Sequence, residues 1–257
     1  MSHDTLNGRT AVVTGGASGI GLAVAERLAA GGAQVVIGDI QSEAGGDTAR
    51  RVGGLFVEAD LSQQAGCRLL IDRTLEAYGT VHILVNNAGY QHVEPIESFP
   101  EETWDNMIAL MLTGAFRLTK YTWPVMRTQG WGRIVNIASI HGLVASPFKS
   151  AYNTAKHGLI GLTRTAALEG GSDGITVNAI CPAYVRTPLV EKQIADQARA
   201  HGLPPEQVVE TIMLEPAAIK RLIEPEDVAE MVAYFCSDAA RAITGAVWTI
   251  DLGWTSR

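Results

Sequence analysis

The segment "TGGASGIG", residues 14–21, decides the fold of this chain, because its glycines stand where a strand turns into a helix. A short β-branched run, "TAVVT", precedes it, and residues 19–31 then carry apolar side chains at helical spacing. Gly15, Gly19 and Gly21 allow a tight turn in which backbone amides approach a pyrophosphate at the positive end of the helix dipole. Glycine also ends strands for purely steric reasons. It is the position between strand and helix that favours a dinucleotide site.

The alternation of strand and helix continues along the chain. Short apolar runs bounded by Gly, Asn, Asp or Pro predict further strands buried on both faces: "AQVVIGD", "HILVNNAG", "GRIVNIAS", "GITVNAICP" and "GAVWTIDLG". Helical patterns separate them, notably at 19–31, 62–78, 101–128, 151–169 and 225–237. This order predicts parallel strands joined by right-handed crossovers. We therefore expect a single α/β domain over residues 1–257, a doubly wound parallel sheet of the Rossmann type.

One compositional shift interrupts this order, between residues 184 and 223. The stretch is polar and carries prolines at 188, 204, 205 and 216. We expect it to form a helical lid, inserted before the last helix and strand. A surface helix without a gating role is the alternative that the sequence leaves open.

Composition excludes several classes of protein. The formal net charge of -7 and the lack of Lys or Arg runs argue against nucleic acid or anionic membrane, and favour a small diffusible ligand. Cys67, Cys181 and Cys236 are widely separated and form no C-x-x-C pair, so we expect neither a disulfide framework nor a metal site. No signal peptide or apolar segment of roughly 20 residues is present, and we expect a soluble cytoplasmic protein.

Polar residues at strand ends suggest which dinucleotide binds. Asp39 ends the second predicted strand, where its carboxylate can accept hydrogen bonds from both hydroxyls of an adenosine ribose and would repel a 2′-phosphate. The glycine-rich turn contains no Lys or Arg, so the sequence favours NAD over NADP. Asp60 is suited to the adenine amino group, and "NNAG", residues 86–89, to the floor of the adenosine pocket. A solvated strand-end Asp39 and ordinary turn chemistry are the alternatives.

The motif "YNTAK" places Tyr152 four residues before Lys156, so that both share one face of a helix. Together with "TGGASGIG", "NNAG" and Ser139 after "RIVNIA", it resembles the short-chain dehydrogenase/reductase family across essentially the full length. The resemblance implies that Tyr152 is the base that takes the proton from a secondary alcohol. It also implies that the Lys156 ammonium lowers the pKa of Tyr152, and that Ser139 orients the substrate oxygen.

Longer segments are similar to the members of this family that oxidise D-3-hydroxybutyrate: residues 89–105, 139–158, 185–194 and 251–257. The resemblance implies reversible, NAD-dependent oxidation of this hydroxy acid to acetoacetate. The positions that match the family's binding site for the substrate carboxylate are Gln91, His141, Lys149 and Gln193, and Trp254 matches the wall at the methyl end. An exposed lysine, a satisfied loop histidine and a core or interface tryptophan are the alternatives.

The resemblance also implies a set of cofactor residues, in which Val185 and Thr187 of the lid hold the nicotinamide carboxamide and the pyrophosphate. The full set is Gly15, Ser18, Gly19, Ile20, Gly21, Asp39, Asp60, Leu61, Asn87, Ala88, Gly89, Tyr152, Lys156, Val185 and Thr187. Members of the family pair through the helices predicted at 101–128 and 151–169 and often form tetramers. We therefore expect a homotetramer built through apolar residues on these helices, such as Leu110, Phe116, Leu159, Leu162 and Leu168.

Several positions depart from the family pattern. Met111 replaces an asparagine that supports a local helix distortion and whose main-chain carbonyl anchors a water in the proton path from the lysine. Ala183 strains its turn if the backbone there needs positive φ, Tyr184 replaces a tryptophan, and Leu252 replaces a glycine. Two rival functions remain: a reductase of another 3-oxo acid or ketone, and a weakly active dinucleotide-binding module, which only Met111 favours.

We predict that Met111 reduces turnover while the Ser139, Tyr152 and Lys156 trio stays intact. A thioether cannot replace an amide, so the departure disturbs the geometry of the proton path more than the presence of its carbonyl acceptor. The substitution Met111→Asn should therefore raise kcat in a steady-state assay. An unchanged or lower kcat would contradict this account.

Overall fold

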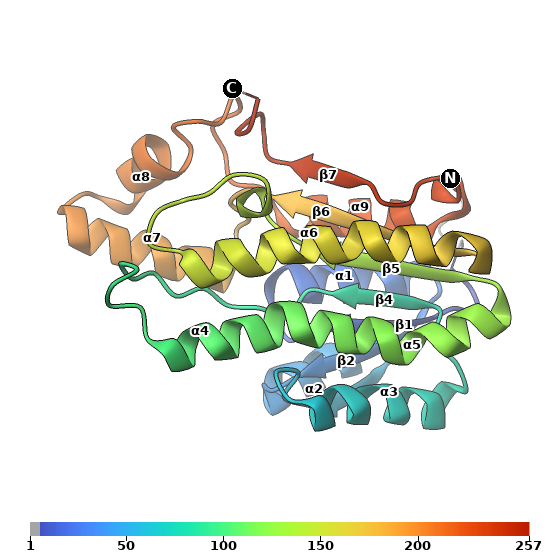
Figure 1. The fold of residues 1–257 in the computed structure, drawn as a ribbon. Coiled ribbons are helices and arrows are strands. Elements are labelled where there is room, and N and C mark those ends of the chain that lie inside the picture. The colour runs from blue at the N-terminus through green and yellow to red at the C-terminus, as the bar shows by residue number, and fades with distance from the viewer. Residues whose placement is uncertain (1–5, 257) are drawn as a thin grey trace.

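The computed structural model describes residues 6–256, without the side chains of residues 192, 196, 197 and 199–201. Its centre is one sheet of parallel strands in the order β3-β2-β1-β4-β5-β6-β7 (Figure 1). The strands are β1 (Thr10–Thr14), β2 (Gln34–Asp39), β3 (Leu55–Glu58), β4 (Ile83–Asn86), β5 (Gly132–Ile137), β6 (Ile175–Pro182) and β7 (Val247–Ile250). All six pairings between neighbours are parallel. The predicted doubly wound sheet is confirmed.

The strand order reverses beside β1, and this fixes where a ligand can bind. Val12 of β1 lies opposite Val36 of β2 on one side and Leu84 of β4 on the other. From β1 the chain first builds outward through β2 and β3, then returns to build β4 to β7 on the other side. The crossovers therefore diverge at the carboxyl ends of β1 and β4, and the gap between them is where open α/β sheets bind ligands.

Helices cover both faces of the sheet (Figure 1). One face packs against α1 (Gly19–Ala30), α2 (Ser42–Val52) and α9 (Pro225–Cys236), and the other against α3 (Gln64–Tyr78), α5 (Ala115–Gln129) and α6 (Ser150–Gly170). Strand residues such as Val12 and Ile83 are fully buried between these layers, as their β-branched composition predicts. No helix in the described part of the chain is both long and apolar enough to cross a membrane.

Two details of the helices differ from the sequence patterns. The prediction missed α2, because its sequence "SEAGGDTARRV" contains two glycines and few apolar residues. The pattern at 101–128 is not one regular helix: α4 (Glu101–Ile108) and α5 are joined by a π-helical segment, η1 (Ala109–Gly114). Met111 lies inside η1, so the distortion expected of an asparagine is present with methionine in its place.

The segment 184–223 lies beyond the carboxyl ends of the strands, where Figure 1 shows α7 and α8 at the left of the molecule. It contains α7 (Pro188–His201), α8 (Pro205–Val208) and a π-helical turn, η4 (Val209–Met213). Val185 pairs with Ile223 in a parallel bridge, which brings the two ends of the segment together. Its gating role as a lid stays a prediction.

Candidate active site

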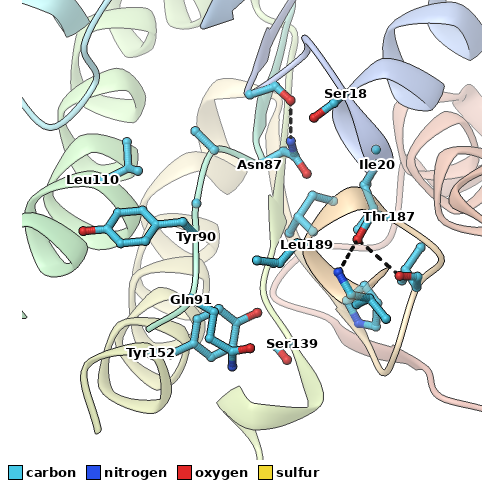
Figure 2. A pocket seen from close by; sticks show the side chains of 18 of the residues that line it. Ser18, Ile20, Asn87, Tyr90, Gln91, Leu110, Ser139, Tyr152, Thr187 and Leu189 are labelled. Atoms are coloured by element: carbon cyan, nitrogen blue, oxygen red, sulfur yellow. Dashed lines mark hydrogen bonds between the residues drawn. The ribbon is translucent and has the colours of Figure 1, made fainter. Parts of the chain in front are cut away.

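A cavity of about 390 Å³ opens at the carboxyl ends of the strands, beside the point where their order reverses. Figure 2 shows Ser18, Ile20, Asn87 and Thr187 toward one end of it, and Ser139, Tyr152 and Gln91 toward the other. Its size falls in the range of small-molecule and cofactor sites, about 300–1,000 Å³. The lining residues show that the cavity extends from the glycine-rich turn to Tyr152 and Lys156 of α6.

The glycine-rich turn has the backbone geometry that its sequence predicts. Gly15 and Gly19 both adopt positive φ, at 65° and 54°, which side chains rarely tolerate. A Cβ atom on Gly21 would collide with the Gly15 carbonyl, so Gly21 lets the helix approach the strand and does not line the cavity. Ser18 at the N-cap of α1 makes no capping hydrogen bond with its side chain. The first amides of the helix are thus free of a side-chain cap.

Asp39 and Asn87 make the wall beside this turn rigid. The Asp39 carboxylate accepts hydrogen bonds from the Ala17 and Gln41 amides, both at 3.0 Å, and is 7% exposed. The Asn87 side-chain amide donates to the carbonyls of Thr14 (2.9 Å) and Gly15 (3.1 Å). A fixed carboxylate, a close-packed glycine turn and a helix N-terminus are the features that suit a dinucleotide, so these residues fit that cofactor.

Tyr152 and Lys156 of α6 lie at the other end of the cavity. The Lys156 ammonium is 5.6 Å from the centre of the Tyr152 ring and donates to the Ile137 carbonyl at 2.7 Å. Burial lowers the pKa of Lys156 to about 8, so the ammonium form still dominates at neutral pH. Burial raises the pKa of Tyr152, and a hydrogen bond with Ser139 opposes this. A phenolate at Tyr152 therefore needs positive charge beside it.

Ser139 follows β5 with an extended backbone, φ −171°, and its hydroxyl accepts a hydrogen bond from the His141 amide at 3.1 Å. This bond holds the Ser139 hydroxyl at the end of the cavity where Figure 2 also shows Tyr152. Because the trio is brought together by β5 and α6, a substrate oxygen between Ser139 and Tyr152 would meet two hydroxyl groups at once.

Polar residues from three parts of the chain meet next to the trio. Lys149 is 6% exposed, its Nζ faces the Tyr184 ring at 5.9 Å, and it has no ion pair among the described residues. His141 is 4% exposed, and its Nδ1 has no hydrogen-bond partner. Gln193 of α7 donates to Gln91 across the cavity. A buried cation without an ion pair, beside a buried imidazole nitrogen without a partner, is costly without a ligand, so this cluster suits an anion.

Burial determines the charges in this cluster. Burial, with help from Lys149 and His157, lowers the pKa of His141 to about 4, so its imidazole is neutral near pH 7. Burial lowers the pKa of Lys149 to about 8, so its ammonium carries the positive charge at neutral pH. An anion bound here would therefore be paired with Lys149 and hydrogen-bonded by His141.

The structure brings almost all the predicted site residues to this one cavity. Those that line it are Gly15, Ser18, Gly19, Ile20, Asp39, Asp60, Leu61, Asn87, Ala88, Gly89, Gln91, Ser139, His141, Lys149, Tyr152, Lys156, Val185, Thr187 and Gln193. Gly21 and Trp254 do not line it. Trp254 packs edge-on to His141, with ring centres 6.1 Å apart, and its indole donates to the Met213 carbonyl at 3.3 Å. Trp254 therefore packs against His141 of the cavity wall without lining the cavity itself.

The sequence analysis missed some residues of the cavity wall, and it considered backbone strain at Ala183, where the structure has none. The missed residues are Ile40 and Tyr90, which both line the cavity. Ile40 is 66% exposed, and its position as an apolar residue directly after Asp39 could have indicated its place on the wall. Ala183 does not have positive φ, so the strain considered there is absent. Leu252 has φ 56°, a conformation in which glycine is usual, and its carbonyl accepts from the amides of Ala218 and Ile219.

Comparison with known proteins agrees with this geometry. A family model described as enoyl-(acyl carrier protein) reductase matches residues 15–255. A D-beta-hydroxybutyrate dehydrogenase of Rhizobium meliloti (strain 1021) is 47% identical, over 97% of this chain and 99% of its own. A second protein of that name, from Cupriavidus necator, is 44% identical over 98% of this chain and 100% of its own. The crystal structure of levodione reductase superposes with a TM-score of 0.90 at 34% identity, covering 98% and 99% of the two chains.

We predict that binding of a short carboxylate weakens as pH rises through about 8, because Lys149 then loses its proton. Well above that pH the protonated fraction falls about tenfold per unit, so the Kd for butyrate should rise by roughly fifteenfold between pH 8 and 9.5. Isothermal calorimetry in the presence of dinucleotide measures it. His141 stays neutral over this range and adds no charge.

The matched control is Lys149→Arg, which keeps a positive charge throughout this range. The variant should bind butyrate with little pH dependence. If its Kd rises with pH as steeply as that of the parent protein, Lys156, whose pKa is also about 8, is the group that titrates and the assignment of Lys149 is wrong.

Proposed function

The chain belongs to the short-chain dehydrogenase/reductase family, and we propose that it oxidises D-3-hydroxybutyrate reversibly to acetoacetate, with NAD as the hydride acceptor. The observation that carries this proposal is the position of the cluster Gln91, His141, Lys149 and Gln193. It lies in the same cavity as Ser139, Tyr152 and Lys156, so a small acid held there by its carboxylate presents its hydroxyl group to the trio.

The trio would move the proton of the alcohol. Ser139 and Tyr152 hold the substrate hydroxyl, and the Tyr152 phenolate takes its proton while the hydrogen on the same carbon leaves as hydride. When bound, NAD accepts this hydride and its positive nicotinamide ring favours the phenolate. Lys156 supplies the second positive charge, which opposes the rise that burial causes in the pKa of Tyr152.

The anion-binding cluster explains why a small 3-hydroxy acid is the best candidate. Lys149 would neutralise the carboxylate, while His141 and the amides of Gln91 and Gln193 would donate hydrogen bonds to it. Gln193 belongs to α7, so a bound acid would join the segment 184–223 to the rest of the site. Substrate binding and closure of that segment would then be coupled, which excludes water from the hydride path.

Asp39 supports the choice of NAD. Its carboxylate is held at the cavity wall by two backbone amides, where it would hydrogen-bond ribose hydroxyls and repel a 2′-phosphate. The lysines that line the described cavity, Lys149 and Lys156, belong to its other end. No cation of the cavity wall therefore compensates for the charge of Asp39.

The first test is NADH formation from NAD with D- and L-3-hydroxybutyrate offered separately. We expect turnover of the D form alone. Tyr152→Phe should reduce kcat by roughly 10²–10⁴-fold, the usual contribution of general acid-base catalysis, because its proton acceptor is lost. Dinucleotide binding should be retained in this variant.

The outcomes separate the rival functions. Turnover of a bulkier 3-oxo acid or a ketone without a carboxylate, unaffected by Lys149→Gln, would identify a different reductase and reject the proposed substrate. Tight dinucleotide binding with no turnover of any of these compounds would favour the binding module.

We predict that Asp39→Ala shifts the cofactor preference toward NADP. Removing the carboxylate removes two hydrogen bonds to the ribose of NAD and the repulsion of the 2′-phosphate of NADP. The NAD/NADP ratio of kcat/KM should therefore fall by at least about tenfold, or 1.4 kcal/mol. Parallel assays with the two cofactors measure it, and Glu58→Ala, on the neighbouring strand end but outside the cavity, is the control. An unchanged ratio in Asp39→Ala would mean that another residue sets the preference.

We also propose that the chain assembles as a homotetramer. Phe116 of α5 is 49% exposed and Leu168 of α6 is 87% exposed, and apolar surface of this kind on two long helices suits pairing with a second copy. Leu159 is buried in the core and does not contribute to this surface. Size-exclusion chromatography with light scattering should give four times the chain mass of 27.4 kDa; a monomer mass would reject the proposal.

A further inference from the structure

Phe148 has a backbone conformation that its side chain disfavours. Its φ is 64°, in the left-handed region, and among the described residues Leu252 is the one other non-glycine residue with positive φ. A bulky side chain is rare in this region because its Cβ crowds the backbone. Phe148 is also 55% exposed, so burial of its ring offers little compensation. The conformation is therefore held by contacts that other residues make.

Three hydrogen bonds hold the turn that contains Phe148. The Glu94 amide donates to the Phe148 carbonyl at 2.9 Å, and the side-chain amide of Asn153 donates to the Ser146 carbonyl at 2.8 Å. The main-chain amide of Asn153 donates to the Lys149 carbonyl at 2.9 Å, in the first turn of α6. None of these bonds uses the Phe148 side chain. They fix the path of the backbone there, and the side chain has to accept it.

The strained residue comes directly before Lys149, whose burial is itself unfavourable. Lys149 is 6% exposed and lines the main cavity, whereas Phe148 does not line it. The titratable side chains near the Lys149 ammonium in the described structure are His141 and Tyr184. Both are neutral at pH 7, because burial lowers the pKa of His141 to about 4 and raises the pKa of Tyr184. Without an anion in the cavity, two adjacent residues are therefore both in unfavourable states.

Both unfavourable states would be relieved together if the turn relaxed. A change of Phe148 to negative φ would remove its backbone strain and redirect the chain at Lys149, so that the ammonium could reach solvent. The bonds from Glu94 and Asn153 oppose that change. The folded chain thus keeps a strained turn at the place where it presents a cation to the cavity, and strain of this kind is typically retained at binding sites.

We propose that Phe148 is a positioning residue, whose left-handed backbone aims the Lys149 ammonium into the cavity toward a small carboxylate. The inference rests on the proposed function for the identity of that anion. The bond between Glu94 and Phe148 also ties the loop that carries Gln91, which Figure 2 shows near Tyr152, to the loop that carries Lys149. A carboxylate held by Gln91 and Lys149 would therefore meet donors on two loops that are joined directly.

Competitive labelling with acetic anhydride, read by peptide mass spectrometry, tests the position of Lys149 without substrate or cofactor. The unprotonated amine is the form that reacts, so the pH at half-maximal labelling reports the pKa of each lysine. Burial lowers the pKa of Lys149 to about 8, and we expect that midpoint in the parent protein. Lys156, whose pKa burial also lowers to about 8, is the internal reference, since a change in the turn at Phe148 should not move it.

The decisive substitution is Phe148→Val, because a β-branched residue is poorly compatible with positive φ. The turn should relax, Lys149 should reach solvent, and its labelling midpoint should rise by about two units toward the ordinary lysine value. The Kd for butyrate in the presence of dinucleotide should rise by at least about tenfold at pH 7, because the buried ammonium no longer meets the anion. A midpoint that stays near that of the parent in this variant would overturn the proposal.

Two controls separate the backbone of Phe148 from its ring. Phe148→Gly removes the ring but adopts positive φ without strain, so the Lys149 midpoint should be unchanged and the Kd for butyrate should stay within about twofold of the parent. Leu143→Val places a β-branched residue in the same loop at negative φ, −112°, outside the cavity, and should change neither quantity. The proposal fails if either control shifts the Lys149 midpoint as far as Phe148→Val does.

If Phe148→Val does not fold, Asn153→Ala takes its place, because it removes the bond to the Ser146 carbonyl that opposes relaxation. The Lys149 midpoint should then rise by about one unit, and adding Phe148→Gly should restore it, since an unstrained turn no longer needs that bond. A double variant that keeps the raised midpoint, or a single variant without one, would contradict the proposal. If the parent binds no butyrate and oxidises no hydroxy acid, the proposed function fails, while the labelling midpoints still test the position of Lys149.

Discussion

One buried hydrogen bond, from the Lys156 ammonium to the Ile137 carbonyl, organises the reacting end of the molecule. A charge that is 4% exposed is costly unless strong acceptors surround it, and this bond is the one that the main chain supplies. It also joins α6 to the last residue of β5. Ser139 follows β5 and Tyr152 precedes Lys156 by one helical turn, so the positions of both hydroxyl groups depend on this junction.

The main cavity has opposite electrostatic requirements at its two ends. At the glycine-rich turn, backbone amides and the helix N-terminus attract phosphate, while the Asp39 carboxylate places a fixed negative charge on the wall beside them. At the other end the charge is positive, on Lys149 and Lys156, and burial lowers the pKa of both ammonium groups. Two ligands together match this distribution of charge: a dinucleotide at the glycine-rich turn and a small anion at the end that holds Lys149 and Lys156.

The sequence predicts most of the sheet because strands such as β1, β2 and β4 are short β-branched or aliphatic runs followed by glycine or a polar residue, and that pattern depends only on local burial. Helix α2 was missed because a helix with two glycines is stabilised by packing under β2 and β3, which no local pattern reveals. The positive φ of Leu252 was equally hidden, since its carbonyl is fixed by Ala218 and Ile219, more than thirty positions earlier. Most site residues were found through motifs; Ile40 and Tyr90, whose place on the wall depends on tertiary contacts, were not.

The segment 184–223 has a small apolar core of its own, formed by residues such as Val190, Ile194, Val208, Met213 and Leu222, separate from the clusters on the two faces of the sheet. Its attachments to the rest of the chain include the hydrogen bond from Gln193 to Gln91, those from the Ala218 and Ile219 amides to the Leu252 carbonyl, and the packing of Trp254. A unit with its own core and few attachments opens at a lower free energy than the whole domain. Its amides would exchange with solvent deuterium as one cooperative group, earlier than those of β1 and β4, and limited proteolysis would cut here while the sheet stays folded.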